Sequence, residues 1–166
     1  VSIPWDNRIM EAGMVHLCFM FATLLAEELK SHRHLMTDYA VEFADHATRY
    51  SRGDYLNALI TEGEMYRTFN TIMETHDAFI CPSLAVTGIP ADGKGCDIDS
   101  VVAWLMTLPF NMLSRCPVLN VPTGFAENGM PTGMQIVGQT YSDLSVFQVG
   151  ANYESAAGRN SLRPKI

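Results

Sequence analysis

Cysteine, histidine and lysine are among the residue types in this sequence that could act as nucleophiles, metal ligands or bases. Cys18, Cys81, Cys96 and Cys116 show no CxxC spacing and have no nearby histidine pair at zinc-finger spacing, so a metal site is not expected. Three of the four lie inside apolar runs, where a free cysteine usually packs as a small hydrophobe. This pattern predicts that the cysteines are structural free thiols. It also predicts a reducing compartment, which we expect to be the cytoplasm.

Serine catalysis would need a base beside the nucleophile and N–H donors aimed at the oxyanion. The sequence contains no GxSxG, no SxxK and no glycine-rich serine loop. Lys30 lies beside acidic residues, Lys94 between glycines and Lys165 near the chain end, so burial should neutralise none of them. The motifs therefore identify no catalytic residue.

The histidines and the segment DGKG at 92–95 offer only weak signals of a ligand site. His16 lies in an apolar stretch and is more simply a hydrogen-bonded core histidine than a ligand. His32 and His34 are two residues apart, so they would diverge on a helix and share a face only on a strand; we expect both to face solvent. DGKG lacks the outer glycine and the Ser or Thr of a phosphate-binding loop, so a nucleotide site is not expected.

The charge balance argues against nucleic acid and anionic membranes as partners. Eleven basic and eighteen acidic side chains give a net charge of -7, the wrong sign for affinity to phosphates. Hydrophobic residues make up 48% of the 166 residues, enough for one folded unit with a core. The longest apolar run, residues 12–26, is too short to favour a transmembrane segment.

Residues 1–77 have the periodicity of a mainly helical region. The spacing predicts helices over Arg8–Lys30, with Asp6 or Asn7 as the cap, over His34–Ser51, and over Tyr55–Thr75, with Asp54 as the cap. Leu35 and Tyr39 in the second helix, and Tyr55 and Leu59 in the third, are expected to face the core.

Within the first helix, residues 12–26 are apolar on nearly every side. A helix of this kind must be buried all round, and so small a chain rarely encloses one completely. We therefore expect additional polypeptide to cover it; the alternative is the central helix of a small bundle.

Residues 78–158 change from helical periodicity to strands, loops and a closing helix. Short apolar runs predict strands at 78–81, 118–121 and 134–137, the last two joined by a turn at Asn128-Gly129. A loop is expected over Ser83–Asp97, a short helix over Asp97–Thr107, and a final helix from Ser142 or Asp143 to Ala157. Residues 159–166 are expected to form a frayed tail, and the whole chain a single α/β unit.

Five segments carry a resemblance to a known family, in a consistent order along the chain. They are GDYLNALI (53–60), HDAFICPS (76–83), PFNMLSRCPVLNVPTGF (109–125), GMPTGMQIVG (129–138) and DLSVFQVGANYE (143–154). Together they resemble the C-terminal portion of the amidase signature family of serine amidohydrolases. The resemblance covers about two thirds of the chain.

The resemblance implies a carboxamide hydrolase with a mixed β-sheet flanked by helices, working without a metal or organic cofactor. Its nucleophilic Ser, bridging cis-Ser and base Lys belong to the N-terminal half of the family, and none matches a position here. The chain is therefore expected to be a C-terminal portion, inactive alone, whose partners are the N-terminal half and a small amide substrate.

The resemblance also suggests site residues. The substrate-pocket candidates are Pro82, Ser83, Asn111, Arg115 and Cys116. The family usually has Thr at the position of Ser83 and Gly or Ala near Arg115, so Arg115 either marks a substrate preference or faces solvent. Backbone geometry and internal hydrogen bonds are the expected roles of Pro117, Pro122, Gly124, Gly133, Gln135 and Gly138. The same structural role is the more economical one for Asn111.

A second hypothesis belongs to a different functional class. The chain could be a noncatalytic scaffold or interaction domain that associates, including as a homo-oligomer, through its apolar N-terminal helix. A stable monomer with no exposed apolar surface would argue against this hypothesis.

Overall fold

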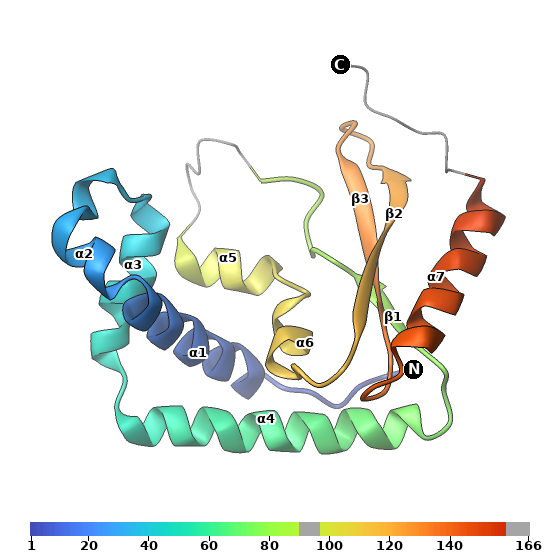
Figure 1. Ribbon diagram of the computed structural model, residues 1–166, viewed down its shortest axis with the longest axis horizontal. Coiled ribbons are helices and arrows are strands. Elements are labelled where there is room, and N and C mark those ends of the chain that lie inside the picture. Colours follow the sequence, from blue (N-terminus) through green and yellow to red (C-terminus); the bar gives the residue numbers. More distant parts are fainter. Residues whose placement is uncertain (90–96, 159–166) are drawn as a thin grey trace.

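The computed structural model describes residues 1–89 and 97–158 as helices packed around a small sheet (Figure 1). In chain order the elements are α1 (Arg8–Leu24), α2 (Ala26–Ser31), η1 (Arg33–Leu35), α3 (Asp38–His46), η2 (Ala47–Arg49), α4 (Arg52–Met73), β1 (Phe79–Pro82), α5 (Ile98–Trp104), α6 (Leu108–Met112), β2 (Val118–Phe125), β3 (Pro131–Val137) and α7 (Asp143–Ala157). The long helix α4 runs beneath the other elements, and α7 lies on the side of the sheet opposite α5 and α6. The expectations for Lys94, Cys96, Lys165 and the tail lie outside the described residues.

The sheet has the strand order β1-β3-β2, and both pairings are antiparallel. The predicted pairing of the last two strands is confirmed, and its turn contains Gly129 at a φ of 79°, which favours glycine. Both hairpin strands extend beyond their apolar runs because half-exposed strands also accept Thr, Pro and Gly near their ends. Helices packed on strands confirm the α/β class.

The first helix differs from its prediction in length and in how it is covered. It ends at Leu24, because Leu25 leaves the helical region before α2 begins. Helices α3, α4, α5 and α6 pack on it and bury its first half. Gly13 permits this close approach, since a Cβ there would lie 2.5 Å from Leu108 Cδ2. The chain thus covers part of this helix itself, while Met20 and the 71% exposed Leu24 remain uncovered in the described structure.

The predicted helix over His34–Ser51 is wrong in its boundaries and in part of its buried face. The segment forms α3 with a 3₁₀ turn on either side, because Met36 and Thr37 are extended and interrupt the helix. Ala40, Phe43 and Ala44 turn toward the core, while Leu35 and Tyr39 are exposed. The sequence spacing assumed one unbroken helix, and the interruption changes the phase of the side chains.

Helix α4 begins three residues earlier than predicted. Ser51, not Asp54, is the N-cap: its Oγ accepts the Asp54 N–H at 3.2 Å, and the Asp54 carboxylate accepts the Ser51 N–H at 2.7 Å. These reciprocal bonds form a capping box. Ala58 and Phe69 of this helix are buried, whereas Tyr55 and Leu59, which were predicted to face the core, are exposed.

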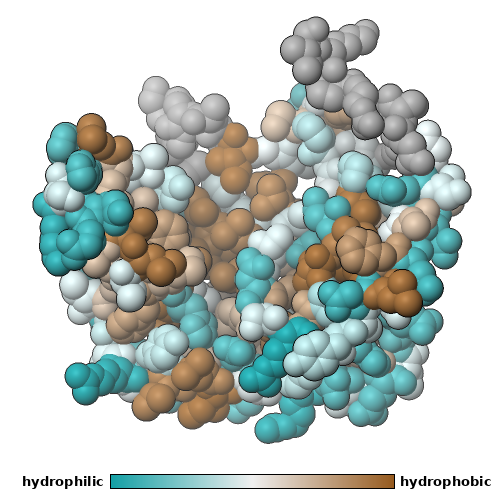
Figure 2. All heavy atoms as spheres, in the orientation of Figure 1, coloured by the Kyte–Doolittle hydropathy of each residue, from teal (hydrophilic) through white to brown (hydrophobic). Residues whose placement is uncertain are grey.

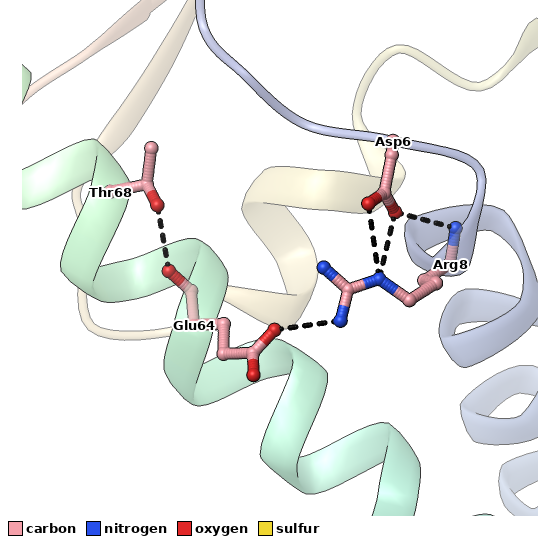
Figure 3. Close-up of polar contacts among 4 residues, drawn as sticks. All are labelled: Asp6, Arg8, Glu64 and Thr68. Carbon is pink, nitrogen blue, oxygen red and sulfur yellow. Dashed lines mark hydrogen bonds and ion pairs between the residues drawn. The ribbon is translucent and has the colours of Figure 1, made fainter.

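An exposed ion-pair group connects the start of α1 to α4 (Figure 3). Arg8 Nε donates to both carboxylate oxygens of Asp6 at 3.1 Å, and its Nη1 donates to Glu64 Oε2 at 2.9 Å. Asp6 also accepts the Arg8 N–H, so it acts at the helix start in place of the Asn7 side chain, which makes no capping bond.

Aromatic rings join the helices to the sheet in one core. Phe69 of α4 lies 5.9 Å from Phe79 of β1, 6.0 Å from Phe110 of α6 and 6.4 Å from Trp5, between ring centroids. Such tilted and edge-to-face contacts are favourable beyond the area they bury. The predicted helix over Asp97–Thr107 ends earlier, at Trp104. A further helix that was not predicted, α6, has Pro109 in its first turn and brings Phe110 to this core.

Candidate functional site

Residues 83–89, the described part of the loop predicted over Ser83–Asp97, lie at one end of the sheet. The C-terminal end of β1, residues 83–89 and the start of β3 enclose a cavity of ≈ 730 Å³ with mostly apolar walls. Pro82 and Ser83 both line it, as does Gly133. Antiparallel pairing produces this arrangement, because it sets the end of β1 beside the beginning of β3. We refer to this space as the Ser83 cavity.

Ser83 is held in place by hydrogen bonds to residues of the other two strands, β3 and β2. Its backbone N–H donates to the Gly133 carbonyl at 3.1 Å, and its Oγ donates to Asn120 Oδ1. A Cβ at Gly133 would lie 3.1 Å from Asn120 Oδ1 and 3.3 Å from Ser83 Oγ, so a larger residue there would crowd this contact. Asn120 was not among the predicted site residues. The feature of the sequence that could have indicated Asn120 is its polar side chain within the apolar run at 118–121.

Gln135 connects the end of β1 to the segment between α5 and α6. Its side chain is 1% exposed, and its Nε2 donates to the carbonyls of Pro82 and Met106, each at 3.0 Å. A buried amide of this kind is stable only with its hydrogen bonds made. Gln135 therefore sets the position at which the Ser83 loop leaves the sheet.

The other pocket candidates lie elsewhere. Asn111 of α6 lines a second cavity, of ≈ 1040 Å³, between α1, α4 and α6. Arg115 is exposed, with its guanidinium carbon 5.9 Å from the centre of the Tyr66 ring, and Cys116 is buried. The structure thus brings Pro82 and Ser83 together but does not bring them to the same cavity as Asn111. Arg115 and Cys116 line neither cavity.

The remaining motif residues make backbone contacts around the sheet. The Gly138 N–H donates to the Pro117 carbonyl at 3.0 Å, and a Cβ at Gly138 would lie 2.5 Å from Ser142 Oγ. The register shifts between Pro122 and Gly124, and Gly124 has a φ of 132°, which few other residues adopt.

The described thiols are poor nucleophiles. Burial raises the pKa of Cys18 to about 11, and it also raises the pKa values of Cys81 and Cys116. Because the thiolate is the reactive form, these cysteines stay protonated and unreactive near neutral pH.

Bases and metal ligands are equally sparse in the part of the chain that the structure describes. Lys30 is exposed, and its ammonium lies 2.8 Å from Glu27. His46 and His76 direct Nδ1 to the backbone carbonyls of Glu42 and Ile72, each at 2.9 Å. Over residues 1–89 and 97–158, no three His, Cys, Asp or Glu side chains gather as a metal site. None of the helices described there combines the length and hydropathy that a membrane span requires. The residues around the Ser83 cavity can therefore form the wall of a pocket that holds a ligand.

A family model described as Amidase matches residues 19–147, more than half of the chain. The chain belongs to the amidase family. An acylamidase of Rhodococcus erythropolis is 31% identical to this amidase chain over 133 residues, which cover 76% of the chain and 28% of the relative. A glutamyl-tRNA(Gln) amidotransferase subunit from Thermosynechococcus vestitus is 30% identical over 135 residues, covering 81% of this chain and 27% of that protein.

Solved amidase structures share the fold of this chain. A crystal structure of an amidase superposes with a TM-score of 0.79 at 23% identity, covering 94% of this chain and 37% of the other. A bacterial aryl acylamidase gives a TM-score of 0.74 at 22% identity, with 99% and 38% covered. This amidase chain therefore spans less than a third of the length of the two curated relatives and less than two fifths of the two solved chains.

Proposed function

We propose that this chain is the C-terminal part of an amidase that hydrolyses small carboxamides to a carboxylate and ammonia or an amine. The observation that supports this most strongly is the amidase match over residues 19–147, which contains the strands around the Ser83 cavity. The similarity to an acylamidase supports a carboxamide as the substrate class. The raised thiol pKa values and the absence of a matching serine motif are consistent with a nucleophile outside these residues.

In the proposed reaction, a neutral lysine draws the proton of the nucleophilic serine through a bridging cis-serine. The serine oxygen attacks the amide carbon while backbone N–H groups stabilise the oxyanion. The amine leaves with a proton, and water then hydrolyses the acyl-enzyme. We place all three catalytic residues in the N-terminal half, so the isolated chain should be inactive, and the reaction needs no metal or organic cofactor.

This chain would contribute a wall of the acyl pocket in that enzyme. The apolar lining of the Ser83 cavity suits an alkyl or aryl group, with Ser83 Oγ as a polar group at its edge. Pro82 and Ser83 are therefore our preferred pocket residues. Asn111, Arg115 and Cys116 remain weaker candidates, because they lie away from this cavity. A cytoplasmic location fits the free thiols of Cys18, Cys81 and Cys116.

Reconstitution tests the proposal directly. The chain and an N-terminal amidase half are purified separately and mixed, and ammonia release from simple amides is measured. We expect turnover from the complex and none from either part. In the active complex, Ser83→Ala should change KM more than kcat, whereas Ser31→Ala on the exposed surface of α2 should change neither. A well-folded complex without turnover would contradict the proposal.

The second candidate function is a noncatalytic interaction domain, favoured by the exposed Met20 and Leu24 at the end of α1. The similarity to an amidotransferase subunit is consistent with a role in a multi-subunit enzyme. In this case Leu24→Glu should abolish binding of a protein partner, and no complex with an N-terminal half should hydrolyse amides.

A further inference from the structure

The hydroxyl proton of Ser83 is already used inside the protein. Ser83 is half-buried, and its Oγ donates a hydrogen bond to Asn120 Oδ1 of β2. Its backbone is fixed as well, because the Ser83 N–H donates to the Gly133 carbonyl at 3.1 Å. A serine hydroxyl has one proton to donate and two lone pairs that accept. Since Asn120 takes the proton, Ser83 Oγ offers only its lone pairs to a molecule in the Ser83 cavity.

Gly133 leaves the space beside this oxygen open. Ser83 and Gly133 both line the cavity, and a Cβ at Gly133 would lie 3.3 Å from Ser83 Oγ and 3.1 Å from Asn120 Oδ1. A side chain at this position would therefore cover the contact, whereas glycine leaves the lone pairs of Oγ accessible to a ligand.

The surroundings of Ser83 are apolar and carry no charge among the lining residues that the structure describes. Figure 1 places residues 83–89 between α5 and the hairpin of β2 and β3, and Figure 2 shows hydrophobic residues gathered in that region. The hydroxyl oxygens of Thr123 and Thr132 lie 2.8 Å apart and bond to each other, and Cys81 Sγ accepts a bond from Gln135. A charged group without a partner is costly in such surroundings. The donor that suits Ser83 is therefore a neutral O–H or N–H.

We propose that Asn120 is a positioning residue that makes Ser83 a hydrogen-bond acceptor, so that the cavity selects acyl groups carrying a neutral O–H or N–H donor. This inference rests on the proposed function, because it takes the Ser83 cavity as the acyl pocket. It narrows the substrate class from alkyl and aryl carboxamides in general to those with such a donor. A site that hydrogen-bonds a substrate hydroxyl discriminates against the analogue without it.

Binding of two related acids tests this selection. The chain is mixed with an N-terminal amidase half, and calorimetry gives the dissociation constants of para-hydroxyphenylacetate and para-methoxyphenylacetate. Both are carboxylates of the kind that the proposed reaction releases, so their binding requires no turnover. The methoxy acid keeps the oxygen but has no proton to donate. We expect the hydroxy acid, as the para or the meta isomer, to bind about threefold to tenfold more tightly, the range for one hydrogen bond.

Substitutions at Asn120 separate positioning from a structural role. Asn120→Leu should reduce the ratio of the two dissociation constants to about one, because a freed Ser83 hydroxyl can also donate to the methoxy oxygen. Asn120→Asp keeps an acceptor oxygen and should preserve the ratio. Ser83→Ala should abolish the ratio, and adding Asn120→Leu to it should have no further effect. A purely structural role of Asn120 would weaken both acids alike and leave the ratio unchanged.

The matched control is Asn152→Leu at an exposed position of α7, which should leave the ratio unchanged. Circular dichroism of each variant checks that it is folded. The inference would be overturned by a complex that binds the hydroxy and methoxy acids equally, prefers the methoxy acid or binds neither, and also by an unchanged ratio in Asn120→Leu. A complex that shows the ratio but hydrolyses no amide would contradict the proposed function alone. Equal binding in a complex that does hydrolyse amides would overturn this inference alone.

Discussion

Gln135 is the fully buried polar side chain on which the candidate site depends most. One amide nitrogen serves carbonyl groups of two separate segments, at Pro82 and Met106. Replacing the amide removes both donors at once and leaves the two carbonyls without these partners beside the core.

We expect Gln135→Leu to lower the free energy of unfolding by about 1–3 kcal/mol, the usual cost of leaving buried polar groups unsatisfied. Urea denaturation followed by circular dichroism measures this. Gln148→Leu, the same substitution at an exposed position of α7, should change the stability by less than about 0.5 kcal/mol. Equal effects of the two variants would show that burial of Gln135 is unimportant.

Two glycines provide a second test at the scale of single residues. A Cβ at Gly138 would lie 2.5 Å from both Ser142 Oγ and Val146 Cγ2, whereas one at Gly63 in α4 would meet nothing within 4 Å. Gly138→Ala should therefore destabilise the chain by about 1–3 kcal/mol. Gly63→Ala should stabilise it by roughly 0.5–1 kcal/mol, because alanine loses less backbone entropy in a helix. Thermal unfolding of both variants gives the sign of each effect.

At the scale of elements, the capping box makes the start of α4 sensitive to acid. The N–H of Ser51 donates to the Asp54 carboxylate, and this bond lowers the pKa of Asp54 below its usual range. A carboxyl whose pKa is lower in the folded state stabilises the fold above its unfolded pKa of about 3.9 and loses that contribution as the pH falls through the folded value.

Asp54→Asn should therefore reduce the loss of stability between about pH 5 and pH 3, since the variant has no carboxyl to protonate at the cap. The urea midpoint measured across this range tests it. Asp6, Asp45 and Asp97 also have lowered pKa values and keep part of the acid sensitivity. Glu127→Gln at the exposed hairpin turn is the control; a slope unchanged in Asp54→Asn would contradict the assignment.

At the scale of the whole molecule, the aromatic core should couple the helices to the sheet. Phe69→Ala removes the ring that contacts Trp5, Phe79 and Phe110, so it should cost about 3–5 kcal/mol. Tryptophan fluorescence and circular dichroism should still report one coincident transition. Phe147→Ala, at an exposed position on α7, should cost much less. Separate transitions would show that helices and sheet unfold independently.

Local patterns in the sequence predicted the helical first half, the antiparallel pair around Asn128-Gly129 and the amidase family, because periodicity, turn residues and linked motifs act over short distances. The same patterns failed where an element ends. Ser51 with Asp54 three residues later could have revealed the true start of α4, but the break at Leu25 has no comparable local signal.

Only the tertiary structure decided what surrounds each side chain. Gln135 bonds to carbonyls 53 and 29 positions away, and Ser83 meets Asn120 from 37 positions away, so no local window contains either pair. The exposure of Leu56 and Ile60 was likewise settled by which helices pack on α4. Burial depends on the packing of distant segments, and one sequence pattern of apolar residues is compatible with both a covered and an open face.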